Sequence, residues 1–109
     1  MKFISRTEEF ILLAIMDLES QAYAVKIRDF LLDAVGEDWA FGALFVMMDR
    51  LVKKGLLSST LSDPTPQRGG RRKRIYKLTE KAFDELERIR SLQESVWSRT
   101  PLPTKNGGA

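Results

Sequence analysis

Apolar residues recur at helical spacing in four stretches of the chain, and this pattern predicts most of its regular structure. Thr7 is the expected N-cap of the first helix, where acidic residues occupy the first turn. Gly36 and Gly55 are the expected ends of the second and third helices, and Thr79 starts the last one. The four predicted helices cover residues 7–19, 22–35, 42–54 and 80–99.

The segment between the third and fourth helices has a different pattern. Residues 56–62 and 74–79 are suited to strands, and the intervening DPTPQRGG contains two prolines and two glycines. Two strands joined by such a turn form a hairpin. The stretch EDWAF alternates Trp39 and Phe41 with a small residue, which fits either a short strand or a packed loop.

The order of these elements predicts a fold that is mainly α with a small β-hairpin. Two helices joined by a short turn and followed by a hairpin form a winged helix-turn-helix, in which the hairpin is the wing. In such modules the last helix of the trio enters the major groove of DNA. We expect residues 1–78 to form this DNA-binding domain, residues 79–99 a long C-terminal helix, and residues 100–109 a flexible tail.

The composition excludes the common catalytic and metal sites. The 109 residues include no histidine and no cysteine, so a Ser-His-Asp triad, a Cys-His pair and the usual zinc sites are impossible within the chain. Neighbouring carboxylates are most simply charged surface near helix starts; they are Glu8/Glu9, Glu37/Asp38 and Asp84/Glu85. We therefore expect no enzyme, no metal and no cofactor.

The net charge of +3 is concentrated in one segment. Residues 56–78 hold six basic side chains and one acidic side chain, whereas the rest of the chain sums to −2. An isolated charged turn is usually solvated surface. After a helix-turn-helix, the same cluster favours phosphate binding, because glycine lets a basic tip approach a DNA backbone closely.

The outward face of the third helix is largely apolar. Ala43, Val46 and Met47 can contact thymine methyl groups, and packing near the core is the alternative for Met47. Arg50 and Lys54 can donate to a base edge or a phosphate, and a surface role without base contact is the alternative for Arg50. Specificity would then depend partly on DNA shape.

The second helix and the wing supply the remaining candidates for DNA binding. Tyr23 fits a phosphate contact and a core aromatic residue equally well. The full predicted set is Tyr23, Lys26, Ala43, Val46, Met47, Arg50, Lys54, Arg68, Gly69, Gly70, Arg71, Arg72 and Lys73.

Three segments resemble the PadR-like family of winged-helix transcriptional regulators. AYAVKIRDFL is similar to the family's second helix, GALFVMMDRLVKKGLLSS to its recognition helix and following strand, and GGRRKRIYKLTEKAFDEL to its wing signature. The resemblance covers about residues 8–98, and the single C-terminal helix is typical of the family's smaller members. The chain departs from the family pattern at Phe45, where tyrosine is usual, and at Ala40 and Ala43, where serine or threonine is commoner.

The resemblance implies a homodimer built from the first and last helices, which represses nearby genes through a palindromic operator. Some small members bind flat aromatic compounds at the dimer centre, and Trp97 lies where a flanking aromatic residue is expected. Dimer packing is the alternative role for Trp97. The predicted dimer-interface residues are Phe10, Leu13, Leu86, Ile89, Gln93 and Val96.

The longest apolar run, Phe10–Met16, is far shorter than the roughly 20 residues that a membrane span needs. No small-residue cleavage site follows this run, so we expect no signal peptide. Without cysteine, a cytoplasmic location is the expectation. Because winged helices also serve as scaffolds, the alternative function is a protein–protein interaction module without sequence-specific DNA binding.

Overall fold

The computed structural model describes residues 2–62, 72–100 and 102–103, and within them it confirms a mainly helical fold with an antiparallel hairpin. The elements follow the predicted order, and their ends lie within two residues of the prediction, those of α4 agreeing with it. They are α1 (Arg6–Leu18), the short 3-10 helix η1 (Glu19–Gln21), α2 (Ala24–Val35), α3 (Phe41–Lys53), β1 (Leu57–Leu61), β2 (Arg74–Leu78) and α4 (Glu80–Arg99).

The N-cap of α1 is Ser5, so the prediction that Thr7 caps this helix is wrong. The Ser5 hydroxyl accepts a hydrogen bond from the Glu8 N–H at 3.1 Å, and the Ser5 N–H donates to Glu8 Oε1 at 2.8 Å. This reciprocal pair is a capping box, which requires Ser or Thr three residues before Glu or Gln. Thr7 cannot form one, because Phe10 stands three residues after it.

The turn between α2 and α3 is a loop without a strand. α2 ends at Gly36 as predicted, and the φ of this residue is +81°, in the left-handed region that favours glycine. α3 then begins at Phe41, and Trp39 packs against the core from the loop. Of the two possibilities for EDWAF, the structure contains the packed loop.

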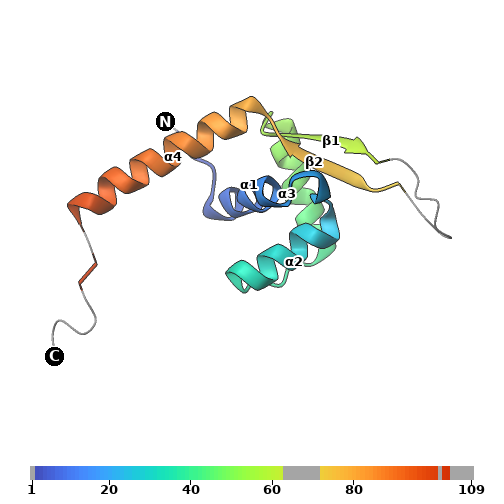
Figure 1. Cartoon of the computed structure of the whole chain (residues 1–109), viewed down its shortest axis with the longest axis horizontal. Coiled ribbons are helices and arrows are strands. Elements are labelled where there is room, and N and C mark those ends of the chain that lie inside the picture. The colour runs from blue at the N-terminus through green and yellow to red at the C-terminus, as the bar shows by residue number, and fades with distance from the viewer. Residues whose placement is uncertain (1, 63–71, 101, 104–109) are drawn as a thin grey trace.

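The hairpin pairs β1 with β2 in antiparallel register, with Leu57 opposite Leu78 and Leu61 opposite Arg74. The Tyr76 N–H also donates to the Ala22 carbonyl at 2.9 Å. The wing is therefore fastened by its backbone to the segment just before α2. Figure 1 shows the hairpin extending from the body in the direction opposite to α4.

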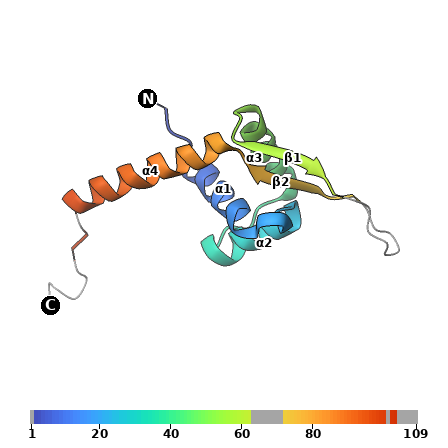
Figure 2. The ribbon, with the colours of Figure 1, turned by 45° about the horizontal axis from the view of Figure 1, so that its top comes forward.

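The hydrophobic core lies between α1, α2, α3 and the inner side of the hairpin. Its buried residues are Ile11, Leu12, Ala14, Ile15, Ala22, Ile27, Leu31, Leu44, Met48, Leu51, Leu56, Leu57, Tyr76 and Ala82. α4 adds little to this core, because among its residues Ala82 and Ile89 alone are buried. In both ribbon views α4 leaves the body and extends past α1 (Figures 1 and 2).

None of the helices in the described residues is both long enough and apolar enough to span a membrane.

A buried carboxylate joins the start of α1 to the end of α3. Glu8 is 5% exposed, and its Oε2 lies 2.5 Å from Nζ of Lys54, which follows α3. Burial raises the pKa of the Glu8 carboxyl, but the hydrogen bonds from Lys54 and Ser5 outweigh this effect and hold the pKa below its ordinary value. Glu8 is therefore charged in the folded protein and stabilises the contact between the two helices.

We expect Glu8→Gln to lower the free energy of unfolding by about 1–2 kcal/mol at neutral pH, because the charge-assisted hydrogen bonds are lost. A carboxyl with a lowered pKa in the folded state stabilises the protein above its unfolded-state pKa, and that contribution disappears as the pH falls through the folded-state pKa. Urea denaturation of both proteins should therefore show a difference at neutral pH that shrinks below about pH 4.

Glu87→Gln, at an exposed position of α4, is the control for loss of a carboxylate without loss of this ion pair. A difference between Glu8→Gln and the parent protein that is the same at neutral and acidic pH would contradict the role of the charged carboxylate.

Candidate nucleic-acid interface

α3 presents an apolar face to solvent, as predicted for the recognition helix. Its inner face buries Leu44, Met48 and Leu51 completely. On the outer face Val46 is 52% exposed and Ala43 is also exposed, whereas Met47 is half-buried against the core. The first eight residues of α3, FGALFVMM, include no side-chain hydrogen-bond donor, and the sulfurs of the two Met residues are only weak acceptors. The side-chain contacts of these two turns with bases would therefore be apolar.

The base of the wing contacts the start of α2. Lys73 Nζ lies 4.1 Å from the centroid of the Tyr23 ring, a cation–π contact. The two residues line an open hollow of about 350 Å³ together with Phe45 from α3 and Arg74 from β2. Phe45 and Arg74 are not among the residues predicted to bind DNA, because neither carries a local signal that places it beside Tyr23. The structure brings α2, α3 and the wing together on one concave surface, which we call the basic hollow.

The two helices of the helix-turn-helix begin without a side-chain cap. The N-cap residues of α2 and α3 are Tyr23 and Ala40, and neither side chain accepts a hydrogen bond from the first turn. Ser5 and Thr79 provide such caps to α1 and α4. The first N–H groups of α2 and α3 therefore lack side-chain acceptors, and together with the helix dipole they favour an anion such as a phosphate.

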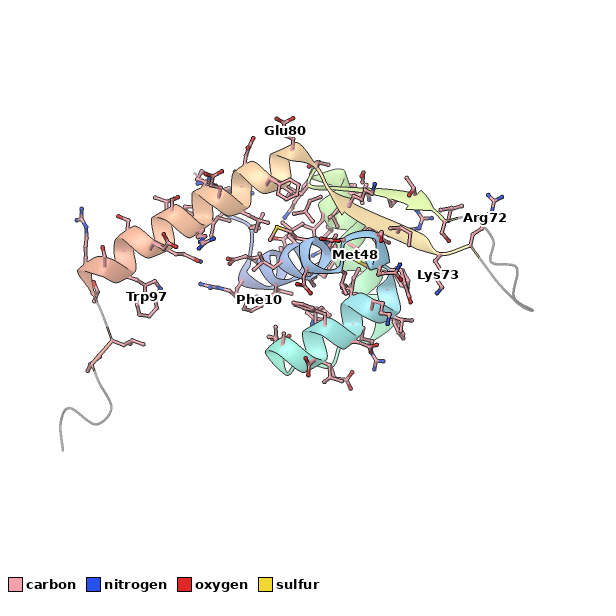
Figure 3. The ribbon with its side chains drawn as sticks, in the orientation of Figure 1. Phe10, Met48, Arg72, Lys73, Glu80 and Trp97 are labelled. Atoms are coloured by element: carbon pink, nitrogen blue, oxygen red, sulfur yellow. The ribbon has the colours of Figure 1, made fainter. Side chains whose placement is uncertain are left out.

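Three predicted cations are exposed and unpaired within the described part of the chain. Lys26, Arg50 and Arg72 form no hydrogen bond or ion pair with another described residue. In these residues, then, no acidic neighbour engages Arg50. Figure 3 shows Arg72 and Lys73 together immediately before β2. The other predicted wing residues lie outside the described residues; they are Arg68, Gly69, Gly70 and Arg71.

Lys54 has a structural contact that the sequence did not reveal. Its ammonium group binds Glu8, and its main-chain carbonyl accepts a hydrogen bond from Lys81 Nζ at 2.8 Å. The Thr79 hydroxyl donates to the neighbouring Gly55 carbonyl at 2.6 Å. These bonds attach the C-terminal end of α3 to α1 and α4. Because its charge is already paired, we leave Lys54 out of the proposed DNA contacts.

The residues predicted for a dimer interface have two different environments. Ile89 is 6% exposed, and Phe10 and Leu86 pack against the core of their own chain. Leu13 and Gln93 are half-buried. The first half of α4 thus packs against the core of its own chain. The helical spacing of its apolar residues does not by itself reveal this.

The second half of α4 exposes apolar side chains. Leu92 is 42% exposed, Val96 62% and Trp97 53%. These residues line an open hollow of about 460 Å³ together with Phe3 and Ile4 from the N-terminal segment. Figure 3 places Trp97 at the end of the molecule opposite to Arg72 and Lys73. The charged and the apolar candidate surfaces are therefore far apart.

Neither a protein-family model nor a curated protein matches this sequence. Among solved structures, a PadR-like transcription factor from Bacteroides fragilis is 23% identical and has a TM-score of 0.67, with 85% of each chain covered. A PadR-like transcriptional regulator from Bacillus cereus is 22% identical, with a TM-score of 0.66 and 85% of each chain covered. A PadR family transcription regulator from Clostridium difficile is 26% identical, with a TM-score of 0.59, and the match covers 84% of this chain and 95% of that one.

The resemblance inferred from three short sequence segments is thus confirmed as a likeness of fold along most of the chain. The protein has the winged-helix fold of the PadR-like transcriptional regulators.

Proposed function

We propose that this protein is a cytoplasmic DNA-binding transcriptional regulator, which acts as a homodimer and represses genes through a palindromic operator. The observation that supports this most directly is the basic hollow, where Lys73 and Arg74 of the wing and the uncapped N-terminus of α2 lie beside Phe45 of α3. Phosphate contacts position a protein on DNA, and a helix in the major groove reads the bases. The structures with the same fold are described as transcriptional regulators, which agrees with this function.

The exposed second half of α4 supports the homodimer. Leu92, Val96 and Trp97 form an apolar stripe that a second copy of the chain would cover. Two copies joined in this way would present two recognition helices, which on a palindrome lie one DNA turn apart, about 34 Å. The hollow beside Trp97 would then close into a site for a small aromatic effector that releases the DNA, since ligand pockets measure about 300–1,000 Å³.

The experiment that tests the proposed function is selection of duplexes from a random-sequence library. Fluorescence anisotropy then measures the affinity for the selected duplex and for a scrambled one at several salt concentrations. We expect tight binding that prefers the selected duplex and falls steeply with salt. If neither duplex binds at low salt, the function is wrong.

The double variant Arg72→Gln/Lys73→Gln should weaken binding to both duplexes and make the salt dependence shallower. Each lost phosphate contact reduces the slope of log affinity against log salt by about one. Arg90→Gln/Arg99→Gln removes the same charge from exposed positions of α4 and is the matched control. Equal slopes for the two double variants would mean that the base of the wing does not contact phosphates.

Replacement of thymine by uracil in the selected duplex tests the apolar readout by α3. Uracil has the same hydrogen-bonding groups as thymine and lacks only the methyl group that Ala43 and Val46 would contact. We expect about a fourfold loss of affinity for each contacted thymine, as for one buried methylene group, with an unchanged salt slope. Val46→Ser should reduce this discrimination. Equal affinity for both duplexes would count against methyl contacts.

Val96→Glu should dissociate the homodimer, because a carboxylate would be buried in the apolar stripe of α4. We expect the dimer dissociation constant to rise at least about tenfold in sedimentation equilibrium. Ser95→Glu places the same charge on the neighbouring exposed residue and should have little effect. A parent protein that is monomeric at tens of micromolar would contradict the homodimer.

A protein-interaction module is the second candidate, since Phe41, Phe45 and Val46 expose an apolar surface on α3 that another protein could cover. The basic side chains of Lys73 and Arg74 beside Phe45 favour DNA instead, because an apolar protein partner would leave them without counter-charges. Absence of DNA binding at low salt would make the protein-interaction module the better supported function.

A further inference from the structure

Arg28 on α2 forms a bridge to the loop that leads into α3. Its Nε donates to the main-chain carbonyl of Trp39 at 2.7 Å, and its NH2 donates to Asp38 Oδ1 at 2.8 Å. The same guanidinium lies over the ring of Phe41, with its central carbon 4.9 Å from the ring centroid. One side chain thus contacts two residues of the loop and the first residue of α3. We call these contacts the Arg28 bridge.

The loop that the Arg28 bridge contacts has few polar contacts of its own. The turn begins with hydrogen bonds from the N–H groups of Gly36 and Glu37 to α2, and the next backbone hydrogen bond belongs to the first turn of α3, where the Leu44 N–H donates to the Ala40 carbonyl. Ala40 is the N-cap of α3, and its methyl group cannot cap the helix. Arg28 therefore supplies the side-chain hydrogen bonds that hold the loop.

The chemistry of these contacts requires arginine. A guanidinium has two donor edges in a fixed plane and a flat face that stacks on an aromatic ring, whereas a lysine ammonium is a single point charge. A surface ion pair such as Arg28 with Asp38 contributes little by itself. The hydrogen bond to Trp39 and the contact with Phe41 add to it, and together the three contacts permit a single orientation of the guanidinium.

The Arg28 bridge is the counterpart of the contacts at the other end of α3. There, Lys54 binds Glu8 and accepts a hydrogen bond from Lys81. α3 has 13 residues and is therefore about 20 Å long, so a small shift of one end changes the angle of the whole helix. The residues that would meet bases, Ala43 and Val46, lie in the half of α3 nearest to Arg28.

We propose that Arg28 is a positioning residue that sets the angle at which α3 enters the major groove, and thereby determines sequence preference without touching a base. Its effect on DNA rests on the proposed function, whereas its effect on the loop does not. The two effects are therefore measured separately.

The first measurement is hydrogen exchange of the amides in residues 38–44, without DNA. Arg28→Lys retains the charge but cannot form all three contacts at once, and we expect exchange in this segment to accelerate about tenfold, while α1 is unchanged. Arg90→Lys, an exposed arginine of α4 that pairs with Glu94, is the matched control. Unchanged exchange in Arg28→Lys would overturn the role of the bridge. If this variant does not fold, Asp38→Ala removes one partner and should accelerate exchange in the same segment by a smaller factor.

The second measurement compares affinities for the selected and the scrambled duplex. If Arg28 positions α3, Arg28→Lys should lower the ratio of these affinities about tenfold and Arg28→Gln should do the same, with the salt slope within half a unit of the parent protein. A slope that falls by about one in Arg28→Gln with an unchanged ratio would mean that Arg28 binds a phosphate, and would overturn positioning. If the parent protein binds neither duplex, the proposed function fails, and the exchange measurement still decides whether the bridge orders the loop.

Discussion

The burial of one face of α3 is the contact on which the rest of the structure depends. Leu44, Met48 and Leu51 have no exposed surface, and they pack into the core formed by α1, α2 and the hairpin. Because these residues share one side of the helix, the opposite side must face solvent, with Ala43 and Val46 upon it. Apolar packing determines which side of α3 is outward. Polar contacts add to it at the two ends of the helix, from Arg28 at the start and through Lys54 at the end.

The molecule separates its charged surface from its apolar one along its length. The basic hollow and the wing lie at one end, and the exposed half of α4 lies at the other (Figure 3). With the proposed function, the separation would let one end bind phosphates while the other joined a second chain, without either surface covering the other. α3 is linked to both surfaces. Its Phe45 lines the basic hollow, and Thr79 and Lys81, at the start of α4, donate hydrogen bonds to the carbonyls that follow the end of α3.

Much of the fold was predictable because its signals are local. The apolar spacing that predicted α2 and α3, the glycine at position 36 and the turn-rich segment before β2 each reflect constraints among residues close in sequence. The error at the start of α1 was also local, since Ser5 and Glu8 contain the complete capping-box signature. The pairing of Lys54 with Glu8 was not predictable, because 46 residues separate the two side chains.

The sequence by itself determined the order of helices and strands, the concentration of positive charge near the wing and the absence of histidine and cysteine. These properties follow from residue type and short-range periodicity. Only the tertiary structure decided which cations remain unpaired, which residues of α4 belong to their own core and how α3 is held at both ends. Such properties depend on distances between elements, as between Lys73 and Tyr23 or between Arg28 and Trp39, and periodicity does not encode those distances.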